Sequence, residues 1–132
     1  MQTVYDFLKK AQTYYLATVE GDQPRVRPFG TIDLFEGKLY IQTGKNKDVS
    51  KQIKANPKVE ISAFDGVGGT WLRIQAKAIE DPRREPKVHM LEAFPSLKDR
   101  YSPDDGNTQV LYLKDAVATF ASFTGAPRVV KF

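Results

Sequence analysis

The feature of this sequence that most constrains its fold is a succession of strand-like segments joined by short turn signals. Each segment is rich in β-branched or aromatic residues or alternates apolar with polar ones, as strands do. Turn signals at residues 20–22, 36–37 and 66–69 separate neighbouring segments, which favours hairpins and a largely antiparallel sheet. The segments are residues 13–19, 24–35, 38–43, 58–64, 70–80, 108–114 and 116–123.

Helical segments alternate with these strands. Apolar residues recur at helical spacing over residues 3–12 and 47–55, with Asn46 as the N-cap of the second, and residues 82–95 form a third helix. A single open sheet would leave its edge strands unpaired, whereas a small barrel removes the edges. We therefore predict one domain over residues 1–132, of the α+β and mainly β class. It is a small antiparallel β-barrel with helices packed outside.

Composition excludes several kinds of site. The 132 residues include no cysteine, so disulfides and thiolate chemistry are ruled out, and with one histidine a metal site is not expected. That residue, His89, is expected to be a partly exposed helix histidine. The net charge of +4 suits an anionic ligand without proving one. The N-terminus is too polar for a signal peptide and no apolar run approaches a membrane span, so a cytoplasmic location without membrane contact is expected.

The first candidate site is the stretch QPRVRPFG, residues 23–30. In a strand, alternate residues share a face, so Arg25, Arg27 and Phe29 lie on one side and Val26 and Pro28 on the other. Proline cannot donate a ladder hydrogen bond, so Pro28 belongs at a sheet edge or a bulge. The two arginines are forked donors suited to phosphate or carboxylate. The alternative is an exposed basic strand face at a barrel edge.

The second candidate is QTGKNKDVSKQ, residues 42–52, where a strand leads through a glycine turn into a helix. The turn offers the Thr43 hydroxyl, free backbone N–H groups, Lys45 and Lys47, and a helix N-terminus favours anions. The spacing is not that of a nucleotide P-loop. A solvated lysine turn is the alternative.

The third candidate is GGTWLRIQ, residues 68–75. Trp71 and Arg73 share a strand face there, and Trp71 is the only tryptophan. A lone tryptophan is usually a core anchor. An aromatic ring beside an arginine could instead stack on a planar ligand.

Taken together, the chain resembles the pyridoxamine 5′-phosphate oxidase-like proteins, which are FMN-binding split barrels. The resemblance runs in order through YYLATVEGDQPRVRPFG, GKLYIQTGKNKDVSKQIKANPKVEI and GTWLRIQAKAIED to a C-terminal strand pair. It is closest to small members of unknown function. Lys45-Asn46-Lys47 replaces the Ser-Arg-Lys run of the true oxidases, Ala76 replaces a common glycine, and the C-terminal substrate pattern is absent. The resemblance therefore does not extend to the pyridoxamine substrate.

The resemblance implies a split barrel that forms a homodimer, with FMN held between the subunits. Lys47 would hold the phosphate, and Trp71 and Arg73 would come from the other subunit. No catalytic acid or base is implied. The cofactor-binding residues implied by the resemblance are Arg25, Val26, Arg27, Pro28, Gln42, Thr43, Lys47, Gln52, Trp71 and Arg73.

We therefore predict an FMN-binding flavoprotein, an FMN-dependent oxidoreductase whose flavin performs the redox chemistry and whose substrate is unknown. One alternative is a basic barrel that binds single-stranded nucleic acid by stacking, although the aromatic residues are not spread along one basic face. Nucleic acid is thus not the expected partner. Another alternative is a split barrel for haem or a deazaflavin. His89 is the only histidine available as a haem ligand.

Overall fold

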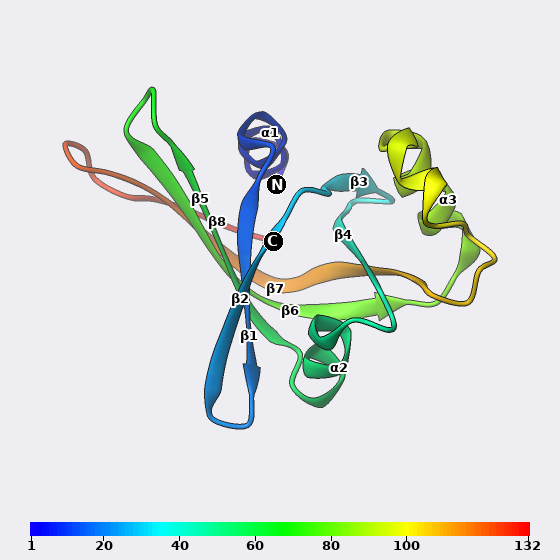
Figure 1. Ribbon diagram of the computed structural model, residues 1–132. Helices are drawn as coiled ribbons and strands as arrows, with labels where there is room; N and C mark the ends of the chain where they lie inside the picture. Colours follow the sequence, from blue (N-terminus) through cyan, green and yellow to red (C-terminus); the bar gives the residue numbers. More distant parts are fainter.

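The computed structural model describes residues 1–132 as one eight-stranded antiparallel sheet curved into a split barrel (Figure 1). The strand order is β2-β1-β5-β6-β7-β4-β3, and β8 adds to β7. The backbone ladder does not close, because β2 and β3 end the path and do not pair with each other. The strands are β1 (Tyr14–Glu20), β2 (Gln23–Phe29), β3 (Asp33–Phe35), β4 (Lys38–Gly44), β5 (Lys58–Asp65), β6 (Thr70–Asp81), β7 (Thr108–Ser122) and β8 (Arg128–Lys131).

Helices cover the outside of the barrel, as the sequence predicts. The helices are α1 (Gln2–Ala11), α2 (Asp48–Ala55), α3 (Arg84–Ala93) and the 3₁₀ helix η1 (Pro95–Asp99). Val4 and Leu8 of α1 and Val49 and Ile53 of α2 belong to the main core. Burying one such side chain is worth roughly 1.5–3 kcal/mol. None of these helices is long and apolar enough to cross a membrane.

Strand alternation builds the core. In β1, the inward residues Tyr14, Leu16 and Thr18 are buried, while Tyr15 between them is exposed. The tight β3–β4 hairpin predicted at residues 36–37 is present. Both turn residues have positive φ, 49° for Glu36 and 73° for Gly37, which suits the twist of a two-residue hairpin.

The C-terminal half differs from the sequence prediction. The segments 108–114 and 116–123 form one strand, β7. Asp115 adopts a φ of 53°, and the register with β6 shifts between Gln75 and Lys77, so pairing continues past this irregular point. The polar pair Lys114-Asp115 therefore marks a bulge within β7 and not the end of a strand. Strand β8 was not predicted, because it is short and mostly exposed.

Two further boundaries were wrong. Segment 24–35 divides into β2 and β3, which pair with different strands. Asn46 is not the N-cap of α2. Lys47 occupies that position, and the Asn46 backbone N–H donates to Asn107 Oδ1 instead.

A smaller core cluster of Tyr40, Met90 and Val110 packs α3 against β4 and β7. The Tyr40 hydroxyl donates to Asp81 Oδ2 at 2.8 Å, and burial with this contact raises the pKa of Tyr40 to about 12. Hydrogen bonds from Arg83 lower the pKa of Asp81 to about 2. This cluster fixes where the chain after α3 runs, and so positions η1.

Candidate functional site

Strand β2 forms an edge of the sheet, as Pro28 predicts. It pairs only with β1, so the missing N–H of Pro28 faces no second strand. The predicted alternation also holds. Arg27 lies opposite Leu16 and Phe29 lies opposite Tyr14, and both Leu16 and Tyr14 are fully buried. The face that carries the arginines is therefore turned inward.

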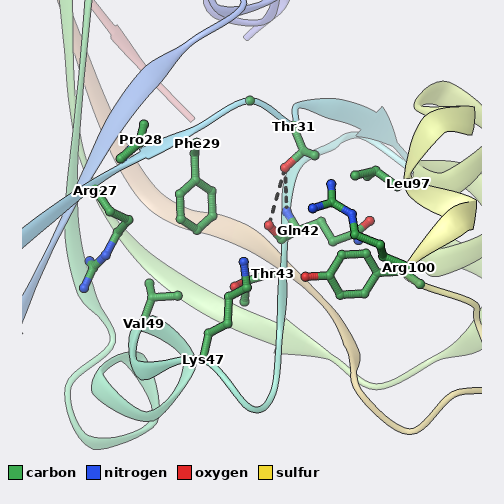
Figure 2. Close-up of a pocket in the computed structure, with 12 residues that line it drawn as sticks. Arg27, Pro28, Phe29, Thr31, Gln42, Thr43, Lys47, Val49, Leu97 and Arg100 are labelled. Atoms are coloured by element: carbon green, nitrogen blue, oxygen red, sulfur yellow. Dashed lines mark hydrogen bonds between the residues drawn. The ribbon is translucent and has the colours of Figure 1, made fainter.

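A hollow of about 210 Å³ lies beside this edge (Figure 2). We call it the β2–β4 hollow. Figure 2 shows Pro28 and Phe29 on one side, Leu97 and Arg100 on the other, and Gln42 between them. Its lining residues are Arg27, Pro28, Phe29, Gly30, Thr31, Gln42, Thr43, Lys47, Val49, Leu97, Arg100 and Tyr101.

One end of the β2–β4 hollow is the start of helix α2. Lys47 is the N-cap residue, and neither the Asp48 nor the Val49 backbone N–H has an acceptor within the protein. The Lys47 ammonium has no carboxylate partner and points between Phe29 and Thr43 in Figure 2. Free N–H groups, the positive end of the helix and an unpaired lysine together make an anion-binding arrangement.

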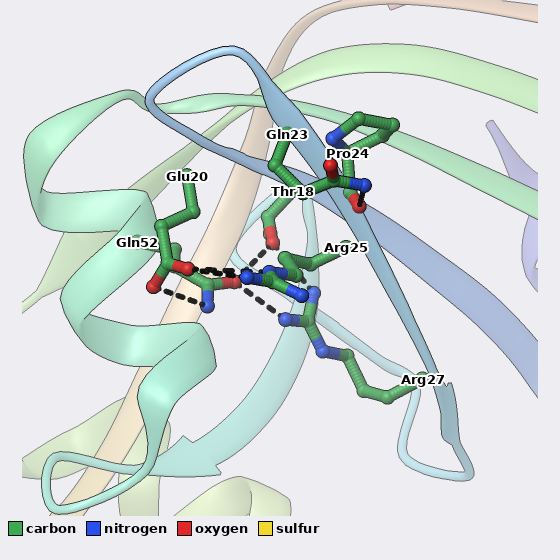
Figure 3. A network of polar contacts seen from close by, with 7 residues as sticks. All are labelled: Thr18, Glu20, Gln23, Pro24, Arg25, Arg27 and Gln52. Atoms are coloured by element: carbon green, nitrogen blue, oxygen red, sulfur yellow. Dashed lines mark hydrogen bonds and ion pairs between the residues drawn. The ribbon is translucent and has the colours of Figure 1, made fainter.

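Arg27 is anchored by neutral groups of its own chain. Its guanidinium donates to Thr18 Oγ1 at 2.7 Å, to the Leu16 carbonyl at 3.3 Å and to Gln52 Oε1 (Figure 3). Burial lowers the pKa of Arg27, but an arginine stays charged in proteins. Because none of these partners is a carboxylate, the positive charge remains available to an anion.

Arg25 is held differently. It bridges to Glu20 at 2.8 Å, with both side chains about half exposed. Hydrogen bonds from Arg25 lower the pKa of Glu20. A groove of about 520 Å³ adjoins the β2–β4 hollow through the shared residues Arg27, Lys47 and Val49, and Arg25, Val26 and Gln52 line only this groove.

Gln42 presents an unusual polar atom. Its side chain is buried, yet its Oε1 has no hydrogen-bond partner. Its backbone is held across the open edge, because the Gln42 N–H donates to Thr31 Oγ1 at 3.0 Å. A buried acceptor without a donor costs free energy, so a ligand N–H or O–H would satisfy it.

Trp71 and Arg73 lie elsewhere. They line a shallow depression of about 250 Å³ on the outer face of β6 and β7. Trp71 contacts Phe123 with ring centroids 4.9 Å apart and the rings tilted by 57°, and Arg73 pairs with Glu60 at 2.9 Å. Trp71 belongs to neither core cluster, so the alternative of a core anchor is wrong. One chain does not bring these two residues to the β2–β4 hollow.

Four lining residues lie outside the stretches singled out from the sequence, namely Thr31, Leu97, Arg100 and Tyr101. Thr31 lies just after β2, whereas the other three follow α3 in a stretch without a recognisable pattern, and only the packing of α3 places those three opposite β2. Arg100 is exposed and makes no ion pair. His89 behaves as predicted: it is about half exposed, and its Nδ1 lies 2.5 Å from Asp33 Oδ2.

Comparison with known proteins identifies relatives of the whole chain. A crystal structure of a NimC/NimA family protein from Clostridium acetobutylicum has 47% identity and a TM-score of 0.96, with coverage of 100% of this chain and 92% of that one. A putative pyridoxamine 5′-phosphate oxidase from Listeria innocua has the same fold at 20% identity, with a TM-score of 0.69 and coverage of 99% and 96%.

A FAD-binding protein from Mesorhizobium loti shares the fold at 17% identity, with a TM-score of 0.64 and coverage of 92% and 94%. No curated protein sequence matches the chain. The family model described as pyridoxamine 5′-phosphate oxidase matches residues 1–129, which confirms the resemblance inferred from the sequence. The chain therefore belongs to the pyridoxamine 5′-phosphate oxidase family.

Proposed function

We propose that this protein binds FMN in the β2–β4 hollow as a homodimer and acts as an oxidoreductase. The observation that carries the proposal is the pairing of two features in one hollow. The start of α2, with Lys47, supplies donors for a phosphate, and Gln42 supplies a buried acceptor without a donor. A flavin nucleotide carries both a phosphate and ring N–H groups.

The lining residues fit such a ligand in their chemistry. Lys47 and the free N–H groups of Asp48 and Val49 would hold the phosphate, with Thr43 and Arg27 beside them. Gln42 Oε1 would accept from the flavin ring, and Pro28 leaves the strand edge free of ladder bonds. When bound, the flavin supplies hydride or electron transfer, while the protein orients it and excludes water.

One protomer provides only part of the site. The β2–β4 hollow of about 210 Å³ is smaller than the ~300–1,000 Å³ typical of ligand pockets. On the outer face of the sheet, Phe64 is 58% exposed and Phe123 is 82% exposed, and both lie next to Trp71. Such a patch favours association. In the dimer we propose, Trp71 and Arg73 of the partner subunit cover the flavin.

The nucleic-acid alternative is not favoured. Arg25, Arg73, Arg83 and Arg84 are each paired with a carboxylate of the same chain, which reduces the charge available to phosphates of a nucleic acid.

The test compares FMN with riboflavin, which lacks the phosphate. FMN should bind tightly and riboflavin much more weakly. Lys47→Gln removes a charge-assisted hydrogen bond worth about 1.5–3 kcal/mol, so FMN affinity should fall at least about ten-fold while riboflavin affinity hardly changes. Fluorescence quenching of each flavin on titration measures both.

Lys45→Gln is the matched control, because Lys45 lies two residues away, pairs with Glu80 and does not line the hollow. It should leave FMN affinity unchanged. Equal affinity of the unaltered protein for FMN and riboflavin would rule out the phosphate site.

A further inference from the structure

A second hollow, of about 440 Å³, lies on the other side of helix α2. We call it the lysine hollow. It shares no residue with the β2–β4 hollow, although Lys47 and Val49 of that hollow and Ser50 and Ile53 of this one follow each other along the same helix. Its lining residues are Lys45, Ser50, Lys51, Ile53, Lys54, Ala78, Glu80, Gln109 and Leu111.

The charge of the lysine hollow is unbalanced. Three lysines line it against one carboxylate, Glu80, which lies 3.6 Å from Lys45. Lys51 and Lys54 are exposed and make no ion pair. Two ammonium groups four residues or fewer apart on one helix repel each other weakly, and an anion between them would remove that repulsion.

The lysine hollow is also lined by a donor that no group of the protein accepts from. Gln109 is only 6% exposed, and its Oε1 accepts a hydrogen bond from Ser50 Oγ at 2.7 Å. This contact turns the amide nitrogen of Gln109 away from Ser50, and that nitrogen donates to no group of the protein. The amide nitrogen is not itself buried, so a fixed and unpaired N–H donor is open to the same hollow as the unpaired lysines.

We infer that the lysine hollow is a second anion site, which takes a small organic molecule bearing a diphosphate. Lys51, Lys54 and the Gln109 amide would bind the phosphate oxygens. Ile53, Ala78 and Leu111 give the hollow an apolar wall for the organic part. Its volume lies within the range of small-molecule pockets. The inference goes beyond the proposed function and does not require that flavin binds.

The experiment is a titration of the flavin-free, ¹⁵N-labelled full chain with pyrophosphate, followed by NMR. The Gln109 side-chain NH₂ signals should shift in a saturable way. The double variant Lys51→Gln/Lys54→Gln removes two exposed charges without touching the core, and pyrophosphate affinity should fall at least about ten-fold. ADP should bind more tightly than pyrophosphate, because its nucleoside can contact the apolar wall.

Two matched variants decide where the anion binds. Lys10→Gln/Lys98→Gln makes the same charge change on α1 and η1, and Lys47→Gln alters the start of α2. Neither variant should shift the Gln109 signals of the free protein or lower the pyrophosphate affinity that they report. Loss of the Gln109 titration in Lys47→Gln would place the anion at the start of α2 and overturn the inference. Equal weakening by the two double variants, or no saturable shift of Gln109, would also overturn it.

Discussion

The β2–β4 hollow and the outer face around Trp71 were predicted as one site, but the protein builds them differently. In the β2–β4 hollow, polar groups are partly buried and held by neighbours, as when Arg27 donates to Thr18, Leu16 and Gln52. On the outer face, Arg73 is bridged to an exposed carboxylate, and Trp71 makes a tilted contact with a phenylalanine that is itself 82% exposed.

This difference separates a region whose polar groups are already held in place from one whose aromatic side chains are partly uncovered. A partly buried, hydrogen-bonded arginine is fixed before any ligand arrives, so little entropy is lost on binding. An exposed aromatic pair acquires a fixed environment only when another surface covers it. The comparison predicts that substitutions in the β2–β4 hollow lower the stability of the single protomer. Substitutions on the outer face should act mainly on dimer stability.

The largest expected effect distinguishes the two arginines of β2. Arg27→Gln removes the charged donor to Thr18 Oγ1 and Gln52 Oε1 and leaves these two groups bonded only to each other, which should lower the free energy of unfolding by about 2 kcal/mol. Arg25→Gln makes the same charge change but breaks only an exposed ion pair, so its cost should be about 0–1 kcal/mol. Urea unfolding measures both. A cost for Arg25→Gln as large as that for Arg27→Gln would contradict the assignment.

The buried hydrogen bond between Tyr40 and Asp81, which lines neither region, gives a reference for a polar contact that involves no ligand. The pKa of Asp81 is lowered to about 2 from its usual 3.8. A lowered pKa means that the stabilisation is fully present above pH 4 and disappears as the pH falls towards 2. Asp81→Asn should therefore cost about 2 kcal/mol at pH 7, a cost that vanishes near pH 2.

Thermal or urea unfolding between pH 2 and pH 7 measures this difference. Asp104→Asn is the control, since Asp104 also pairs with an arginine but is exposed. A pH-independent cost of Asp81→Asn would show that packing, and not the charge, is responsible.

The smallest effect on the isolated protomer is expected at Trp71. Trp71→Ala removes an aromatic pair that is only partly buried, so the barrel should remain folded with a loss of about 1 kcal/mol. FMN affinity and dimer stability should both fall, because Trp71 would act on the flavin of the other subunit. Sedimentation velocity at several concentrations, with and without FMN, measures the coupling.

The control for Trp71 is Val67→Ala, at the fully exposed tip of the β5–β6 hairpin, which projects from the barrel in Figure 1. This variant should bind FMN like the unaltered protein. A monomer that binds FMN tightly would show that one chain builds the whole site.

Much of the local structure could be read from the sequence, since it depends on neighbouring residues. The inward side of β1 and the edge position of Pro28 follow from alternation and from the missing proline N–H. The glycine turn before α2 likewise identified Lys47, which lines the hollow.

Where sequence prediction failed, contacts between distant segments had decided the outcome. Asp115 lies in a bulge within one strand, and not between two strands, because β6 pairs along both halves of β7. The dipeptide Lys114-Asp115 has the same local backbone preference whether it bulges within a strand or separates two strands.

By itself, the sequence determined most of the strands, the helices packed on the barrel, the arginine face of β2 and the start of α2 as a candidate anion site, because each depends on residue spacing and backbone preference. Only the tertiary structure decided that Leu97 and Arg100 line the hollow and that Trp71 lies away from it. It also left Gln42 Oε1 buried without a donor. These outcomes depend on how α3 packs and how the sheet curves, and both are set by contacts between segments far apart in the chain.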